Sequence, residues 1–209
     1  YINYPHELTL TMVGNKHTTD KGTMHYEAHG YTEIYGKYIP NNGSYKLLEI
    51  GIWHGDSIRM WNEYNPNIEL TAVDIDPNIH NYLNGSENFK LYLGDQSDEN
   101  FMCGILNEAN NDFDFVIDDG SHNHDDILNS FKYLFPKMKP GSIYFIEDLH
   151  AGHAEKDKLI SNLFLYQIIV SFIPKISHSA LVSILPQFIL SILRSIFSTV
   201  ARSSSIGIF

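Results

Sequence analysis

The stretch Lys46-Leu-Leu-Glu-Ile-Gly-Ile-Trp-His-Gly-Asp-Ser57 decides the fold. Its first five residues form a short, largely apolar run with the length of a buried strand, and the run ends at Gly51. A helix-like segment from Ser57 to Tyr64 follows. A strand, a glycine turn and a helix in this order begin a strand–helix–strand unit, so the stretch predicts an α/β fold.

Four further strands are expected along the chain. They cover Ile68–Val73, Phe89–Leu93, Phe113–Ile117 and Ser142–Ile146. Helical segments fill the gaps between strands, notably Asp98–Ala109 and Asp125–Phe135. Because strands and helices alternate, we expect a mostly parallel sheet with helices on both faces.

Acidic residues collect at the ends of these strands. In open parallel sheets, ligands bind beyond the carboxyl ends of the strands. The residues found there are Glu49, Asp74, Asp95, Asp118, Asp119, Glu147 and Asp148. We therefore expect them to rim one crevice, and this coincidence is the strongest functional indication in the sequence.

The first three strand ends suit a cofactor that carries adenosine. The turn over residues 51–57 places glycines where the backbone must pass close to a ligand at a helix N-terminus. Its G-x-x-x-G spacing differs from the dinucleotide fingerprint, which counts against a nicotinamide cofactor. Asp74 lies where a carboxylate can bind both ribose hydroxyls, while Asp95 and Gln96 suit an adenine edge. The predicted cofactor site comprises Glu49, Gly51, Gly55, Ser57, Asp74, Asp95, Gln96 and Asp118.

The last two strand ends suit a metal ion. Asp118-Asp119 ends the fourth strand and Glu147-Asp148 ends the fifth. If those strands are neighbours, their backbones lie about 4.8 Å apart and the carboxylates can converge on one ion. Carboxylates so close repel one another unless a cation neutralises them. Oxygen ligands favour Mg²⁺, with Mn²⁺ as a substitute.

His122 follows Asp119 by three residues and is the predicted general base. An alcohol is a poor nucleophile until it loses its proton, and a histidine can accept a proton at neutral pH. A surface or capping role is the alternative for any one of the eleven histidines.

The run Asp118-Asp-Gly-Ser-His-Asn-His-Asp-Asp126, continued to Glu147-Asp148, resembles the signature of metal-dependent sugar O-methyltransferases of the macrocin and mycinamicin type. Asp20-Lys-Gly-Thr23 and the 47–51 turn with Trp61 downstream resemble the same group, and also a set labelled cephalosporin hydroxylase-like. The similarity covers roughly Asp20 to His150. It implies a Rossmann-like class I methyltransferase that uses S-adenosylmethionine to methylate a hydroxyl of a sugar or glycoside.

The resemblance also implies roles for individual residues. Asp119, Glu147 and Asp148 would bind Mg²⁺, His122 would be the general base, and the Asp20-Lys21 arm would close over the site. It places Glu49, Gly51, Asp74, Asp95 and Gln96 around S-adenosylmethionine. The chain departs from the family pattern at Pro140-Gly-Ser142, where Pro-Gly-Gly is usual, and the two strands expected after Asp148 are not evident.

We expect three regions: an arm and helix over residues 1–40, with the helix roughly at Tyr26–Tyr38, a catalytic domain over 41–158, and an apolar helical tail over 159–209. The tail would complete the core, form a homo-oligomer interface, or lie on a membrane surface as an interfacial helix. Its serines and Pro186 count against a membrane-spanning helix.

Composition excludes several classes of protein. A formal net charge of -11 argues against nucleic-acid binding, which needs Lys and Arg to neutralise phosphates. One cysteine, Cys103, excludes an intrachain disulfide and favours a cytoplasmic location. Two alternatives to the methyltransferase stay open: an iron-dependent hydroxylase using His124-x-Asp126, and a non-catalytic or membrane-associated binding protein on a degenerate methyltransferase fold. For an enzyme, the expected partner is a sugar-containing small molecule or glycan.

Overall fold

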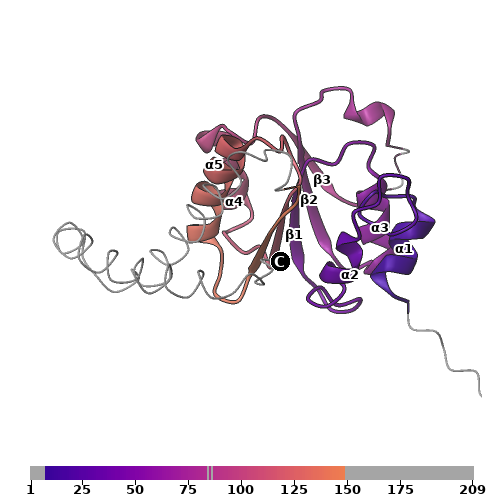
Figure 1. Ribbon diagram of the computed structural model, residues 1–209. Coiled ribbons are helices and arrows are strands. Elements are labelled where there is room, and N and C mark those ends of the chain that lie inside the picture. The colour runs from indigo at the N-terminus through magenta and orange to yellow at the C-terminus, as the bar shows by residue number, and fades with distance from the viewer. Residues whose placement is uncertain (1–7, 84, 86, 149–209) are drawn as a thin grey trace, which may run out of the picture. The chain divides into compact units, whose positions relative to one another are not determined.

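The central sheet positions the acidic residues, which lie at or just after the ends of its strands. The computed structural model describes residues 8–83, 85 and 87–148 (Figure 1). Its five strands are β1 (Lys46–Ile50), β2 (Glu69–Asp74), β3 (Lys90–Leu93), β4 (Phe115–Asp118) and β5 (Ile143–Ile146). All neighbouring pairs are parallel, in the order β3-β2-β1-β4-β5. The predicted Rossmann-like fold class is confirmed.

The order of the strands determines where ligands can bind. The chain moves outward from β1 through β2 to β3, then returns to the other side of β1 with β4. The strand order therefore reverses between β1 and β4, and a crevice opens at such a point beyond the carboxyl ends. Ile50 pairs in register with Asp118, so the two strands end at the same height. The expected adjacency of β4 and β5 is also present.

Helices cover both faces of the sheet (Figure 1). One face carries α1 (Leu10–Lys16), α2 (Tyr31–Tyr35) and α3 (Asp56–Tyr64), and the other carries α4 (Glu99–Glu108) and α5 (His124–Leu134). Leu47 and Leu48 are both fully buried but belong to different core clusters, because successive strand residues point to opposite faces. Trp61 packs in the first cluster and Met102 in the second.

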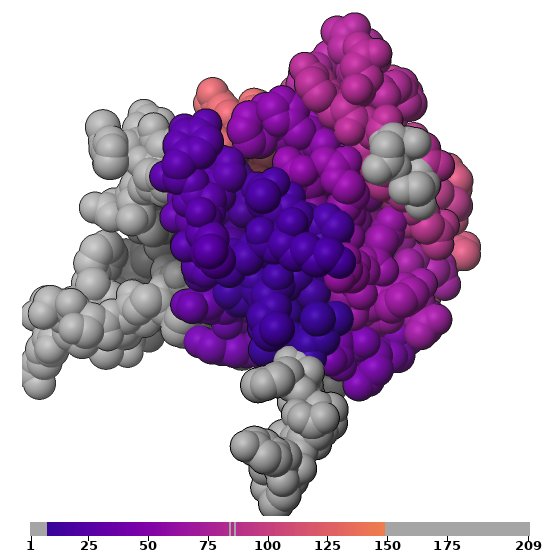
Figure 2. Space-filling model, turned by 90° about the vertical axis from the view of Figure 1, so that its right-hand side faces the viewer, coloured from indigo at the N-terminus to yellow at the C-terminus, as the bar shows by residue number. Residues whose placement is uncertain are grey.

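The N-terminal segment differs from the prediction. The helix expected over Tyr26–Tyr38 is shorter, since α2 covers only Tyr31–Tyr35, and α1 was not predicted. Two backbone hydrogen bonds explain the later start: the His29 amide donates to the Asp20 carbonyl and the Gly30 amide to the Gly22 carbonyl, each at 2.8 Å. They fold residues 20–30 into a loop. In the space-filling view, residues 8–40 cover much of the face that is turned toward the viewer (Figure 2).

The connection between β2 and β3 contains only a short 3-10 helix, η1 (Ile79–Asn81), among its described residues, so strict alternation of strand and α-helix fails there. A second 3-10 turn, η2 (Phe135–Lys137), follows α5. Within the described part of the chain, none of the helices has the length and apolar character needed to cross a membrane. The predicted tail at 159–209 lies outside the described residues, so the three-region division stays a prediction.

Candidate active site

Gly51 brings the turn after β1 against the loop after β4. Its φ of +80° is a conformation that side chains rarely adopt, and a Cβ added there would lie 2.1 Å from the carbonyl oxygen of Asp119. Only glycine permits this approach. The predicted cofactor turn and the predicted metal ligand Asp119 are therefore in direct backbone contact.

A hollow lies beside this contact. Its walls come from the turn after β1, from the N-terminal arm and from the end of β4. The lining residues are Thr19, Asp20, Lys21, Gly51, Ile52, Trp53, His54, Asp56, Ser57 and Asp119. Gly55 caps α3 with a φ of +74°, so the helix begins at the wall of the hollow. The arm predicted to close over the site thus contributes Asp20 and Lys21 to it.

Asp74 and Asp95 end β2 and β3 in different surroundings. The Asp74 carboxylate accepts hydrogen bonds from the amides of Ile52 and Asp76, both at 2.9 Å, which anchors it next to the turn after β1. Asp95 is exposed and accepts from the Ser97 amide at 2.8 Å, and this bond lowers its pKa. Asp74 is thus fixed in place, while Asp95 presents its carboxylate to solvent.

Gln96 and Asp118 are joined by a buried hydrogen bond. The Gln96 amide nitrogen donates to Asp118 Oδ1 at 3.1 Å and to Ser130 Oγ at 2.9 Å, while its oxygen accepts from the Ser121 amide at 2.7 Å. Asp118 is 1% exposed and also accepts from the Tyr144 hydroxyl. Burial raises the pKa of Asp118 to about 7. Both residues use their polar atoms within the protein, and their predicted role at the cofactor stays a prediction.

Lys21 lies at the centre of the acidic cluster. Its ammonium is 3.0 Å from Glu147 Oε1 and 3.6 Å from Glu49 Oε1, and it donates a hydrogen bond to Asp119 Oδ2. Lys21, Glu49 and Glu147 are all buried. Lys21 comes from the loop before α2, whereas the three acids end β1, β4 and β5. The ion pairs therefore join the N-terminal arm to the sheet.

The pKa values follow from burial and from these charges. Burial raises the pKa of Glu147 to about 8 and that of Glu49 to about 7, although Lys21 acts against both shifts. Burial also opposes ionisation of Asp119, but the charge of Lys21 and hydrogen bonds with His122 and Lys21 bring its pKa below the usual value. Burial would lower the pKa of Lys21, but the surrounding carboxylates raise it well above 10.5.

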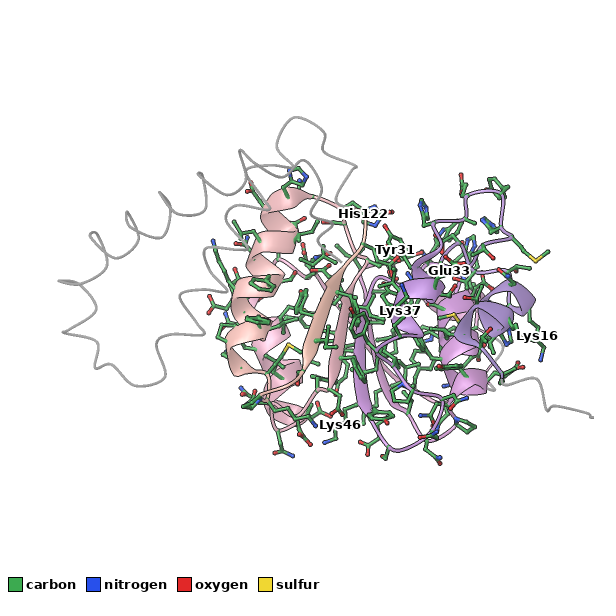
Figure 3. All side chains as sticks on the ribbon, turned by 60° about the horizontal axis from the view of Figure 1, so that its bottom comes forward. Lys16, Tyr31, Glu33, Lys37, Lys46 and His122 are labelled. Atoms are coloured by element: carbon green, nitrogen blue, oxygen red, sulfur yellow. The ribbon has the colours of Figure 1, made fainter. Side chains whose placement is uncertain are left out.

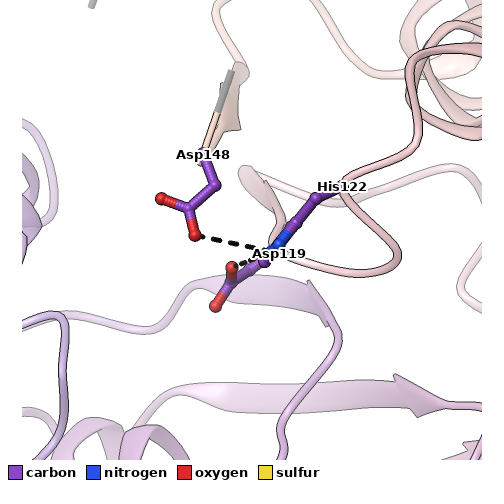
Figure 4. A group of neighbouring side chains, drawn as sticks. All are labelled: Asp119, His122 and Asp148. Carbon is purple, nitrogen blue, oxygen red and sulfur yellow. Dashed lines mark hydrogen bonds and ion pairs between the residues drawn. The ribbon is translucent and has the colours of Figure 1, made fainter. Parts of the chain in front are cut away.

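Asp119, His122 and Asp148 converge beside this cluster (Figure 4). His122 Nε2 lies 3.0 Å from Asp119 Oδ1 and 3.7 Å from Asp148 Oδ2. One ligand atom from each residue lies within 4.8 Å of the other two. The hydrogen bond with Asp119 raises the pKa of His122. The residues that follow the carboxyl ends of β4 and β5 thus form a group that could hold a metal ion.

Two tyrosines of α2 were missed by the sequence analysis. The Tyr35 hydroxyl donates to Glu147 Oε1, and the Tyr31 hydroxyl donates to Asp148 Oδ1 at 2.9 Å. Tyr31 and His122 lie at the same end of the sheet (Figure 3). Tyrosines four residues apart share one helix face, which is the signal that could have indicated a common target. Each tyrosine thus orients one of the two predicted ligands that follow β5.

Comparison with known proteins identifies the central segment. A sequence family described as a methyltransferase domain matches residues 48–149. The matched segment includes β2 to β5 and most of β1. Lys21, Tyr31 and Tyr35 all precede this segment, so three groups that contact its acidic residues come from outside the match.

The chain is also similar to curated sugar O-methyltransferases. Demethylmacrocin O-methyltransferase of Streptomyces fradiae is 29% identical over 185 residues, covering 82% of this chain and 45% of that protein. Mycinamicin VI 2''-O-methyltransferase of Micromonospora griseorubida is 32% identical over 152 residues, covering 69% of this chain and 37% of that protein. The predicted resemblance is confirmed. The chain spans less than half the length of these two relatives.

A solved structure supports the same relationship. The MycE methyltransferase from the mycinamycin biosynthetic pathway, in complex with Mg, SAH and mycinamycin VI, matches with a TM-score of 0.59 and 29% identity. The match covers 74% of this chain and 40% of that chain.

Proposed function

We propose that this protein is an S-adenosylmethionine-dependent O-methyltransferase that methylates a hydroxyl of a sugar or glycoside. Three observations support the proposal. The fold is that of a Rossmann-like methyltransferase, the domain match covers the sheet, and the named relatives are O-methyltransferases of macrolide pathways. The sugar as acceptor rests on the relatives alone.

The observation that carries the chemistry is the convergence of Asp119, His122 and Asp148. These residues combine two carboxylates with a histidine at the carboxyl ends of β4 and β5, and Asp119 also lines the hollow next to the glycine turn. A base and a cation site therefore adjoin the space in which a cofactor would bind. A base and a metal ion both make an alcohol a better nucleophile, so this juxtaposition suits methyl transfer to a hydroxyl.

The residues present fit a hard divalent cation. Oxygen atoms of Asp119 and Asp148 lie close together with Glu147 beside them, and a lysine ammonium already lies among the carboxylates. We assign Asp119, Glu147 and Asp148 as the Mg²⁺ ligands, with Mn²⁺ as a substitute. When bound, the ion lowers the pKa of a coordinated hydroxyl.

The hollow fits the cofactor in a corresponding way. The turn from Gly51 to Ser57 presents backbone at the start of α3, and Asp74 is anchored beside it by the Ile52 amide. We assign the cofactor site to Glu49, Gly51, Gly55, Ser57, Asp74 and Asp95, with Gln96 and Asp118 acting through the hydrogen bonds that connect them to each other and to Ser121. S-adenosylmethionine supplies the methyl group on a sulfonium, from which transfer is an in-line displacement.

His122 acts as the general base. The acceptor oxygen forms a bond to the methyl carbon while the carbon–sulfur bond breaks, and the hydroxyl proton passes to the His122 imidazole. Asp119 holds the ring through its hydrogen bond to Nε2. The neutral form of His122 is the active one, so activity should rise with pH as His122 loses its proton.

The iron-dependent hydroxylase is less well supported. Such enzymes use two histidines and one carboxylate on one face of the metal. Among the described residues, the candidate metal group contains two carboxylates and a single histidine, His122. His124 begins α5, and the Asp126 carboxylate accepts a hydrogen bond from the Ser121 hydroxyl. These two residues do not join the candidate metal group.

Mass spectrometry of glycosides tests the function. Candidate macrolide glycosides and free deoxysugars are incubated with S-adenosylmethionine and Mg²⁺, and the products are examined for a gain of one methyl group. We expect methylation by the wild type, with loss in His122→Ala and Asp119→Ala and retention in His17→Ala, whose ring pairs with Glu63 on α3. Undiminished methylation in both site variants would refute the assigned site.

A further inference from the structure

The Lys21 ammonium occupies a position among the carboxylates that a metal ion would need. Its side chain is 3% exposed, and it contacts Asp119 and Glu147, two of the three proposed metal ligands. Asp119 Oδ2 accepts the Lys21 hydrogen bond while Oδ1 faces His122. An ammonium and a divalent cation that share these oxygens repel one another strongly in a buried site.

Glu49 offers Lys21 an alternative partner. Its Oε1 atom is buried and has no hydrogen-bond partner in the described part of the chain, while Oε2 accepts from Trp61 Nε1 at 3.2 Å. Lys21 Nζ lies 3.6 Å from that oxygen, within ion-pair distance but too far for a hydrogen bond. A small shift of the ammonium would complete a hydrogen bond with Glu49 and release Asp119.

The backbone around Lys21 is held independently of the ammonium. The Lys21 carbonyl accepts from the Thr32 amide at 2.9 Å, and the Gly22 amide donates to the Thr19 carbonyl at 3.0 Å. Both bonds lie within residues 19–32, so the local backbone conformation does not depend on where the ammonium lies.

We propose that Lys21 is an internal counter-cation that a divalent ion displaces from Asp119 and Glu147 toward Glu49. The inference rests on the proposed function for its choice of ion. Without metal, Lys21 neutralises the buried acids and keeps the site folded. With metal, it pairs with Glu49, which lies on the strand that leads into the cofactor turn, so ion binding and the cofactor turn are connected through one side chain.

Calorimetric titration of Mg²⁺ and Mn²⁺ into the chain without cofactor tests the proposal. Lys21→Met should bind the ion more tightly than the wild type, by on the order of tenfold or more, because a competing unit charge a few ångströms away is removed. Its thermal unfolding temperature without metal should fall, and Mg²⁺ should restore more of it than in the wild type. Lys16→Met is the matched control, since Lys16 is 63% exposed and pairs with Glu63.

Lys21→Arg keeps the charge and should bind the ion no more tightly than the wild type. If Lys21→Met does not fold without metal, Mg²⁺ should restore its cooperative unfolding, and failure to do so overturns the proposal. A folded Lys21→Met with wild-type or weaker ion affinity also overturns it. That result differs from the absence of ion binding in both proteins, which would remove the metal from the proposed function itself.

Discussion

The hydroxyl of Tyr31 holds Asp148 by two hydrogen bonds. It donates to Asp148 Oδ1 and accepts from the Asp148 amide, each at 2.9 Å, although the two residues are 117 positions apart in the chain. Asp148 has a φ of 52°, a left-handed conformation that residues other than glycine seldom adopt. The two bonds stabilise that conformation and direct the carboxylate toward His122.

Tyr31→Phe should therefore weaken binding of the metal. Loss of both bonds frees the Asp148 carboxylate, and groups that orient a metal ligand typically contribute about tenfold to affinity. Calorimetric titration with Mg²⁺ measures the change. Tyr38→Phe is the control because Tyr38 is 45% exposed and lies on the same arm. Equal Mg²⁺ affinities in both variants would show that Tyr31 does not orient the ligand.

Gly51→Ala should disrupt both halves of the site. Two effects add: the positive φ costs about 1–2 kcal/mol for a residue with a Cβ, and that Cβ would lie 2.1 Å from the Asp119 carbonyl oxygen. Gly141→Ala separates them, because Gly141 has a φ of +92° but nothing within 4 Å. Chemical denaturation should show a larger loss for Gly51→Ala, accompanied by weaker Mg²⁺ binding. Similar losses in the two variants would argue against the close approach.

The strands were predictable because their apolar runs are short and each ends in acidic or glycine residues. The predicted strand Lys46–Ile50 has the observed bounds, and the others differ by one or two residues at an end. The N-terminal arm was less predictable. Its fold depends on contacts with residues far along the chain, such as Lys21 with Asp119 and Tyr35 with Glu147, and no local periodicity reports such contacts.

The expectation that ligands bind beyond the carboxyl ends of parallel strands located the acidic residues, but not the side chains that contact them. It predicted that Asp119 and Asp148 lie at one edge because parallel neighbours end together, and the structure places these two carboxylates close to each other, with His122 beside them. It could not tell that Gln96 points inward to Asp118, because side-chain direction at a strand end depends on the next loop. Nor could it indicate that a lysine would enter the acidic cluster, since the motif around Lys21 was assigned to the site by resemblance alone.

Stability of the metal-free protein should depend on Asp118. Its pKa is raised by burial from 3.8 to about 7, so the folded state keeps a proton that the unfolded state has lost. The contribution is therefore fully present at low pH and is lost as pH rises through about 7. Asp118→Asn should flatten this part of the profile, measured by urea unfolding with a chelator present.

Glu63→Gln provides the comparison of opposite sign. Hydrogen bonds from Lys16 and His17 lower the pKa of Glu63, so its contribution is present at neutral pH and is lost as the solution is acidified. The effect should be small because the pair lies at the surface. If Asp118→Asn changed the profile only below pH 3.8 and left the range between 3.8 and about 7 unaltered, burial of Asp118 would not be the cause.

Gln96→Leu should destabilise the protein without preventing cofactor binding. The substitution leaves Asp118 Oδ1, which is buried, without its Gln96 partner, and an unsatisfied buried group costs about 1–3 kcal/mol. It also removes the acceptor of the Ser121 amide. The loop that carries Asp119 and His122 would loosen, so the methylation rate should fall more than the affinity for S-adenosylhomocysteine. Asp95→Ala should lower the affinity for S-adenosylhomocysteine and leave stability nearly unchanged, because Asp95 is exposed and has few structural partners. Calorimetry and urea unfolding of both variants distinguish the roles. A large loss of cofactor affinity in Gln96→Leu, at unchanged stability, would mean that Gln96 contacts the adenine as the sequence first suggested.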